Sequence, residues 1–249
     1  MRLMTDRPPI TPWKSIPGNA VPWKSGGPSG PGRTKLSVDV IVDVAMRQLR
    51  ARGYDAVTMR SIATELGTGP ASLYAHVANR NELDSLVNAR ISSMAYVPDP
   101  DPDPGRWDEQ IAEVARELLR LYREHPGTAR CTMGNMPASI EALDPVEKIF
   151  AILRAGGVPD QDAAWFGDQF SLYVASFAME EDIWKSRARA DNLSEAEAWD
   201  HIPPVFANLS ATRFPVLTSL AGALTNGDAD ERFNFGVDLM IQGLKARKG

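Results

Sequence analysis

Residues 58–77 read TMRSIATELGTGPASLYAHV, and the spacing within this stretch decides the fold. Its first half has the apolar spacing of a short helix, which Thr58 would cap and Gly67 would end. After a short turn, Pro70 stands where the first turn of a helix tolerates proline, and two apolar residues follow four apart on one face. Two short helices around a turn that contains glycine have the spacing of a helix-turn-helix.

Helices are also predicted on both sides of this stretch. From Ser37, which is suited to cap a helix, apolar residues recur at three- and four-residue intervals as far as Gly53. Beyond the motif, Asn79 and Glu82 form a capping-box pair for a further helix. We therefore predict a three-helix helix-turn-helix domain over residues 33–96.

The amino-terminal segment, residues 1–32, has a different composition. It holds seven prolines and five glycines and shows almost no aliphatic periodicity. Such a segment buries too little apolar surface to offset the entropy lost on ordering, so we predict a disordered basic arm. The tetrapeptide PWKS occurs in it twice, and two interpretations stay open: a solvated extension, or an arm that touches DNA.

A proline-rich connector is predicted over residues 97–105, where the sequence PDPDPDPG begins at Pro98. Its alternating aspartates resemble the start of a calcium-binding loop. However, proline occupies every other position, and Gln110 stands where the bidentate glutamate should be. A stiff acidic connector is therefore the favoured interpretation.

Beyond the connector, residues 106–249 carry apolar stripes at helical spacing. We expect helices near residues 107–122, 144–157, 160–185, 214–224 and 228–247. Residues 188–212 are predicted to be rich in loops, with one helical turn near Glu195. No stretch is convincing as a strand, so the predicted fold class is all-α, with a second helical domain after the helix-turn-helix domain.

Composition and charge narrow the function classes. The chain of 249 residues has a net charge of −5, yet the part up to Tyr96 carries 12 Lys and Arg against 7 Asp and Glu. A basic first part joined to an acidic remainder fits a surface for phosphates on the first domain only. The chain has no apolar run of the roughly 20 residues that cross a membrane and no secretory signal, so we expect a cytoplasmic protein with no membrane partner.

Metal and cofactor chemistry is not predicted. The single cysteine, Cys131, cannot form an internal disulfide, and the three scattered histidines give no metal-ligand spacing. We interpret Cys131 as a helix-packing residue, with a redox sensor as the alternative. We therefore expect no metal and no cofactor.

With these residues in hand, the chain resembles the TetR family of transcriptional regulators. The resemblance is carried by GYDAVTMRSIA at residues 53–63, Leu66 and Gly67, LYAHV at 73–77, and the pairs 79–80 and 82–83. The later part is similar, more weakly, to the ligand-binding half of tetracycline repressors, through RFP at 213–215 and DERFxFG at 230–236. The resemblance implies a homodimeric repressor that binds a palindromic double-stranded DNA operator and is released by a small-molecule effector. It also implies that residues 33–96 are the DNA-binding domain and residues 106–249 the ligand-binding and dimerisation domain.

Candidate DNA contacts follow from the geometry of the motif. In a helix-turn-helix the second helix lies in the major groove, and flanking groups contact phosphate. Small residues at the start of that helix allow close approach, Arg60 can bind guanine, and Arg80 supplies a further cation. The candidates are Thr58, Met59, Arg60, Thr68, Gly69, Pro70, Ala71, Ser72, Tyr74, His76 and Arg80.

An effector site is predicted on the long helix that begins near Asp160, where aromatic residues recur at intervals of four, three and four. With two aromatic residues of the preceding helix, the candidates are Trp107, Tyr122, Phe166, Phe170, Tyr173 and Phe177. The alternative is that this face is core or dimer seam. Tyr173 favours a pocket because a buried phenol needs a polar partner, and the few charges nearby favour a largely apolar or aromatic effector. The resemblance implies dimer contacts through residues 160–185 and 228–247.

Two other function classes stay open. An enzyme is less favoured, because Gly67 and Gly69 make only a faint dinucleotide-binding turn that follows a helix, and no nucleophile elbow, zinc-protease motif or P-loop occurs. The second alternative is a helical scaffold or degenerate regulator that does not bind DNA. A gel shift on genomic fragments would separate this alternative from a true regulator.

Overall fold

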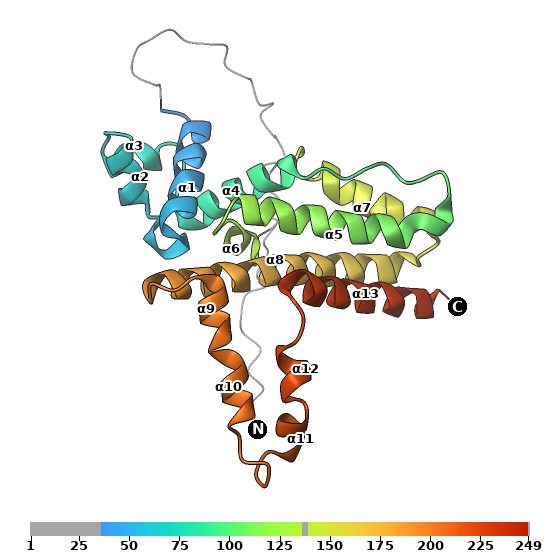
Figure 1. Cartoon of the computed structure of the whole chain (residues 1–249). Helices are drawn as coiled ribbons and strands as arrows, with labels where there is room; N and C mark the ends of the chain where they lie inside the picture. Colours follow the sequence, from blue (N-terminus) through green and yellow to red (C-terminus); the bar gives the residue numbers. More distant parts are fainter. Residues whose placement is uncertain (1–35, 136–138, 249) are drawn as a thin grey trace, which may run out of the picture.

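The computed structural model describes residues 36–135 and 139–248, which form a small helical domain and a larger one (Figure 1). No strand occurs among these described residues, so the predicted all-α class is confirmed. The predicted arm over residues 1–32 lies outside the described part of the chain.

The helices of the first domain begin and end where capping residues stand. They are α1 (Val38–Arg52), α2 (Met59–Glu65), α3 (Pro70–Tyr74) and α4 (Arg80–Met94). The side chain of Ser37 accepts a hydrogen bond from the backbone of Val40, and Thr58 and Ser61 form a capping box at the start of α2. Gly67, with φ at +63°, turns the chain between α2 and α3.

The capping pair predicted for α4 is half formed. Asn79 accepts a hydrogen bond from the backbone of Glu82, as expected. The Glu82 carboxylate instead accepts from the backbone of Ala78, one residue earlier than a capping box requires.

An apolar core holds the first domain together. Its fully buried members from the four helices include Ile41, Leu49, Ile62, Leu73 and Leu83. Burial of each such side chain contributes about 1.5–3 kcal/mol. A helix of five residues is not stable by itself, so α3 is fixed by this core and not by its own helix propensity.

The second domain is a bundle around the long helix α8 (Asp160–Ala190). The helices α5 (Trp107–Glu124), α7 (Asp144–Ala155) and α13 (Ala229–Arg247) pack against α8, and the short α6 (Ala129–Thr132) contacts both α8 and α4 (Figure 1). Cys131 of α6 is buried in the core of the first domain. The two domains are therefore joined through α6 as well as through the connector.

Gln110 fixes the acidic connector to α5. Its side-chain oxygen accepts from the backbone nitrogen of Asp101 at 2.9 Å, and its side-chain nitrogen donates to the carbonyl of Asp99 at 3.0 Å. Gln110, which stands where a calcium-binding loop would need a glutamate, thus holds two residues of the connector in place.

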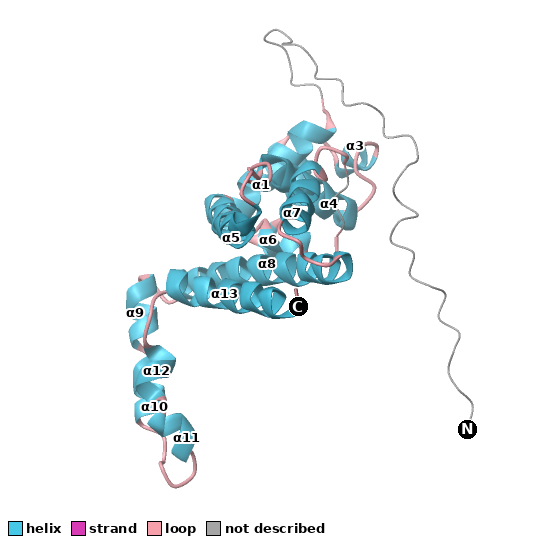
Figure 2. Ribbon diagram, turned by 90° about the vertical axis from the view of Figure 1, so that its right-hand side faces the viewer, coloured by secondary structure: helices cyan, strands magenta, loops and turns pink. Residues whose placement is uncertain are grey.

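An arm extends away from the bundle between the end of α8 and the start of α13 (Figures 1 and 2). From here on, 'the arm' means residues 195–225 and not the amino-terminal segment 1–32. These residues form α9 (Glu195–Asp200), α10 (Ile202–Ala207), α11 (Pro215–Ser219) and α12 (Ala221–Thr225). None of these helices contains a buried residue. The arm therefore has no core of its own.

The prediction of a loop-rich segment over residues 188–212 is wrong, although the helical turn predicted near Glu195 is present as α9. The helix α8 continues to Ala190, and two further helices follow within the segment. Ser194 and Glu197 form a capping box at α9, and the prolines of α10 stand in its first turn, where proline is tolerated. The single short helix predicted over residues 214–224 is divided into α11 and α12 at Leu220.

Candidate DNA interface and effector pocket

The first turn of α3 presents small, exposed residues. Pro70, Ala71 and Ser72 are all exposed, and Tyr74 is 52% exposed although it is aromatic. His76, which follows the helix, is exposed as well. Such an edge can approach a DNA groove closely, and the hydroxyl and imidazole groups can donate hydrogen bonds to phosphate oxygens.

The surface beside α3 carries little free negative charge. Thr58 and Arg60 are exposed at the start of α2, Thr68 is half-buried, and Gly69 is the N-cap of α3. Glu65 is the only acidic residue between positions 58 and 77. Arg47 and Gln48 donate to its carboxylate at 3.1 and 2.7 Å, so this one negative charge is paired. The surface of the motif can therefore contact a polyanion, although the net charge of the whole chain is negative.

Two predicted DNA contacts make their main contacts within the first domain. Met59 is buried in the core, so its side chain does not reach the surface. The Arg80 Nε atom pairs with Asp84 at 2.8 Å. Its other nitrogens donate to the carbonyls of Val57 and Tyr54, and the guanidinium stacks 4.1 Å from the centre of the Tyr54 ring. The cation expected at phosphate instead holds α4 against the segment before α2.

Asp84 is the centre of a buried polar cluster where the domains meet. Its carboxylate also accepts from the Tyr54 hydroxyl at 2.5 Å and from the Cys131 thiol at 3.6 Å. Burial and the nearby Asp84 charge raise the pKa of the Cys131 thiol. Arg130 of α6 stacks on the Tyr54 ring from 4.3 Å. Cys131 is thus a packing and hydrogen-bonding residue that ties α6 to the first domain.

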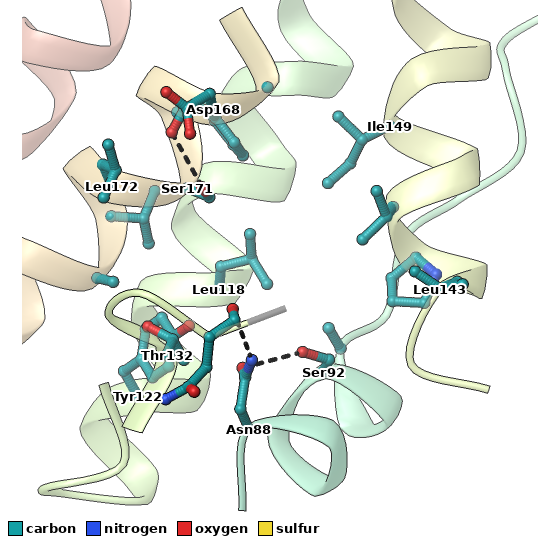
Figure 3. A pocket seen from close by; sticks show the side chains of 18 of the residues that line it. Asn88, Ser92, Leu118, Tyr122, Thr132, Leu143, Ile149, Asp168, Ser171 and Leu172 are labelled. Atoms are coloured by element: carbon teal, nitrogen blue, oxygen red, sulfur yellow. Dashed lines mark hydrogen bonds between the residues drawn. The ribbon is translucent and has the colours of Figure 1, made fainter. Parts of the chain in front are cut away.

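A cavity of about 360 Å³ lies between α4 and the helices of the second domain (Figure 3). Its walls are mostly apolar and come from α5, α7, α8 and the residue before α7: Leu118, Tyr122, Leu143, Ile149, Phe150, Phe170, Leu172 and Val174. Its polar side chains are Asn88, Ser92, Thr132, Asn135, Asp168 and Ser171. A cavity of this size with apolar walls and few polar groups is typical of small-molecule sites.

The predicted effector residues divide into two groups. Tyr122 and Phe170 line the cavity. Four others belong to the core of the second domain and are not among the lining residues: Trp107, Phe166, Tyr173 and Phe177. The alternative interpretation, that the aromatic face is core, therefore describes most of this set.

Tyr173 has its polar partners within the protein, so it does not favour a ligand. Its hydroxyl donates to the backbone carbonyls of Arg232 and Phe233 at 3.3 and 3.0 Å, and its ring stacks on that of Phe233 at 5.5 Å. The polar partner that a buried phenol needs is supplied by α13. Tyr173 therefore belongs to the contact between α8 and α13.

Sequence reasoning missed the part of the cavity that α4 forms. Asn88 and Ser92 stand one turn apart on α4, and Asn88 is only 4% exposed. The sequence signal for this wall is the carboxamide of Asn88, which stands next to Val87 and one turn before Ile91, two buried apolar residues. A polar side chain among buried apolar positions of a helix requires a partner, and here it points to a cavity.

Two family models match the chain. The model described as bacterial regulatory proteins, tetR family, matches residues 41–83, and the tetracyclin repressor-like C-terminal domain matches residues 99–248. The transcriptional repressor DrrR1 of Streptomyces coeruleorubidus is 30% identical over 225 residues, which cover 90% of this chain and 83% of that protein.

Solved structures of a TetR family protein are also similar to this chain. The crystal structure of ActR from Streptomyces coelicolor in complex with actinorhodin is 39% identical, with a TM-score of 0.74, and covers 87% of this chain and 98% of that chain. ActR in complex with (S)-DNPA is 38% identical, also with a TM-score of 0.74, and covers 86% of this chain and 99% of that chain.

The fold and the exposed helix-turn-helix define a DNA-binding regulator, and the chain belongs to the TetR family of transcriptional regulators. The predicted resemblance is therefore confirmed, and the protein is a repressor of the ligand-responsive, DNA-binding type. The family is one of regulators and not of enzymes. Within residues 36–135 and 139–248, no helix is both long and apolar enough to cross a membrane.

Proposed function

We propose that a homodimer of this chain binds a palindromic operator through α2 and α3, and leaves it when a small, largely aromatic molecule occupies the cavity of Figure 3. The position of the cavity carries the proposal. It is lined by α4 of the first domain and by α5, α7 and α8 of the second. An occupant contacts both domains, so its affinity depends on how α4 is placed, which is the condition for release.

The proposed DNA contacts are the members of the predicted set other than Met59, which is buried, and Arg80, which is paired with Asp84. They are Thr58, Arg60, Thr68, Gly69, Pro70, Ala71, Ser72, Tyr74 and His76. One helix of five residues contacts few bases, so selectivity requires two copies of α3. A twofold dimer places these copies on two related half-sites, which makes the operator palindromic.

Exposed apolar residues on α8 and α13 support the dimer. Trp165 and Leu172 of α8 are 63% and 43% exposed, and Phe235 and Leu239 of α13 are 65% and 56% exposed. The same two helices also bury apolar residues in the core. Helices that are apolar on two sides need a second partner, and a second copy of this chain would supply it.

The arm supports the same interface. Its exposed large apolar residues are Val205, Val216, Leu217, Leu220 and Leu224. The arm starts where α8 ends and finishes where α13 begins, so it is continuous with the two helices proposed to meet the partner. A partner seated on these helices would also give the arm a surface to pack on.

Aromatic walls favour an aromatic effector. Tyr122, Phe150 and Phe170 offer ring contacts, and the polar groups of α4 lie at one end. The relative ActR is described in complex with actinorhodin and with (S)-DNPA. We therefore propose an effector of fused or linked rings with polar substituents at one end.

The experiment has two stages. Purified protein is first used to select genomic fragments, and the selected site is mapped by footprinting. Failure to bind any fragment would favour the scaffold or degenerate regulator. Polycyclic aromatic compounds, actinorhodin among them, are then titrated against the protein–operator complex while release is followed by fluorescence anisotropy.

A substitution that fills the cavity locates the effector site. Ala175 is 3% exposed and lines the cavity, so Ala175→Phe should keep operator binding but abolish release. Ala190→Phe, at the exposed end of the same helix, is the matched control. A normal release response in Ala175→Phe would place the effector elsewhere.

A further inference from the structure

We propose that Asn88 of α4 binds a carbonyl oxygen of the effector, so that the DNA-binding domain itself selects oxygen-bearing aromatic molecules over hydrocarbons of the same shape. The inference rests on the proposed function of the cavity as the effector site. It adds the residue that determines specificity and the chemical group that this residue recognises.

Asn88 is buried but poorly satisfied. It is 4% exposed, and Figure 3 shows its side chain directed from α4 toward the cavity. Its Nδ2 donates to the carbonyl of Asn135 and its Oδ1 accepts from the Ser92 hydroxyl, both at 3.4 Å, which is longer than an ordinary hydrogen bond. A carboxamide has two N–H donors and two acceptor lone pairs, so half of this capacity is unused among the described residues.

The neighbouring polar groups are better satisfied. The Thr132 hydroxyl donates to a backbone carbonyl at 2.8 Å, and that of Ser171 does so at 3.0 Å. The Asn135 side chain accepts from Ser85 at 3.1 Å and donates to the carbonyl of Cys131 at 2.9 Å. Asn88 is buried and its hydrogen bonds are longer than these, so its side chain can gain from a ligand.

A carbonyl oxygen is the group that fits the free donor. The Nδ2 atom has a second N–H, and an aromatic ketone or quinone offers an acceptor on a flat, apolar ring system that matches the cavity walls. A hydrocarbon in the same position would exclude water and leave this N–H unpaired, which disfavours its binding. The cavity therefore has a lower affinity for a hydrocarbon than for a ligand of the same shape that carries the oxygen.

The position of Asn88 connects this selection to the first domain. Asn88 stands on α4, and its present hydrogen-bond acceptor, Asn135, follows α6. An effector carbonyl that accepts from the second N–H leaves the bond to Asn135 in place and joins α4 to the effector. Recognition of the oxygen is thus a direct contact between the effector and the first domain.

A matched pair of probes tests the proposal. 2-Aminoanthraquinone and 2-aminoanthracene have the same three fused rings and the same amino group, but only the first has carbonyl oxygens. Binding of each to the full-length protein is measured by quenching of tryptophan fluorescence and by displacement of one probe by the other. We expect wild type to prefer the anthraquinone about tenfold, the effect of one satisfied buried hydrogen bond.

Asn88→Leu keeps the size of the side chain and removes its hydrogen bonds. The ratio of the affinities for the anthraquinone and the anthracene should therefore fall to about one, chiefly because the anthraquinone binds more weakly. Ser93→Ala is the control for a lost hydroxyl, because Ser93 is exposed on the same helix and is not among the residues that line the cavity. Its preference should equal that of wild type. If the leucine variant does not fold, Asn88→Ala, which also lacks the N–H and adds no charge, provides the same comparison.

The outcomes separate this inference from the proposed function. An unchanged preference in Asn88→Leu, or no preference in wild type, overturns the role of Asn88 and leaves the effector site standing. If wild type binds neither probe and no other polycyclic compound, actinorhodin included, the effector site is overturned and the inference with it.

Discussion

Arg60 and Arg80 carry the same charge in very different surroundings. Arg60 is exposed on α2, whereas Arg80 is bonded to Asp84 and stacked on Tyr54. The geometry of the motif predicts that both contact DNA, because a sequence pattern does not show which carbonyls and carboxylates a guanidinium meets in the fold. The different surroundings of the two residues give different expectations for their variants.

We expect Arg60→Ala to weaken operator binding while changing the free energy of unfolding by less than about 0.5 kcal/mol, because its side chain is exposed. The slope of log affinity against log salt should fall by about one. Arg80→Ala should instead cost about 2–3 kcal/mol of stability, because the buried Asp84 carboxylate loses its counter-charge. Urea unfolding and operator titrations over a salt series check both. A stable Arg80→Ala protein with the lower salt slope would restore Arg80 as a phosphate contact.

Asp182 of α8 provides a test by pH. Burial raises the pKa of its carboxyl group above the ordinary value, although the backbone N–H of Gly127 donates to it at 2.6 Å and Lys185 opposes the shift. The folded state thus holds this proton more tightly than the unfolded chain. Stability from this group is greatest at low pH and is lost as the pH rises through the folded-state pKa.

Asp182→Asn keeps an acceptor for Gly127 and removes the charge. Its Tm should therefore exceed that of wild type near pH 7.5, and the gain should vanish as the pH falls toward about 4. Thermal unfolding over this range measures it. Asp182→Ala, which has no acceptor, should unfold at a lower temperature than the asparagine variant at every pH. An asparagine variant that is less stable than wild type at pH 7.5 would show that the carboxylate is net stabilising.

At the scale of elements, α8 and α13 approach closely at Gly236. A Cβ atom there would lie 2.1 Å from the Tyr173 hydroxyl oxygen and 2.5 Å from its ring carbon. Gly236→Ala should therefore destabilise the protein by about 1–3 kcal/mol, although alanine favours a helix more than glycine does. Asp238→Ala, exposed on the same helix, should change stability little. Urea unfolding compares the two, and equal stabilities would mean that Tyr173 moves aside without cost.

The elements that the sequence predicted well have local signals. Ser37, Thr58 and Asp228 begin helices through side chains that bond the backbone three residues on, and such contacts can be inferred from sequence. The four-residue α6 and the six-residue α10 were missed because neither has an amphipathic stripe of useful length. Tyr173 was misplaced because its hydrogen-bond acceptors stand about 60 residues away on α13. Distant partners of this kind determine which aromatic residues are core and which line a cavity.

For the whole molecule, the open question is what covers the exposed apolar residues of α8, α13 and the arm. These elements adjoin along the chain, so one partner surface can cover all of them. A dimer formed in this way also fixes the distance between the two copies of α3, which the operator must match. Oligomeric state and DNA affinity are therefore expected to change together.

We expect wild type to have about twice the chain mass of 27.2 kDa by light scattering at micromolar concentration. The double variant Phe235→Asp with Leu239→Asp should be a monomer, because it places charges on the most exposed apolar residues of α13. Its operator affinity should fall by more than about a hundredfold, since each copy then binds a half-site alone. Ala155→Asp, an exposed position at the end of α7, controls for added charge and should remain a dimer. A double variant that stays dimeric would move the interface from α13 to the arm, whereas a monomer with undiminished operator affinity would contradict the need for two copies of α3.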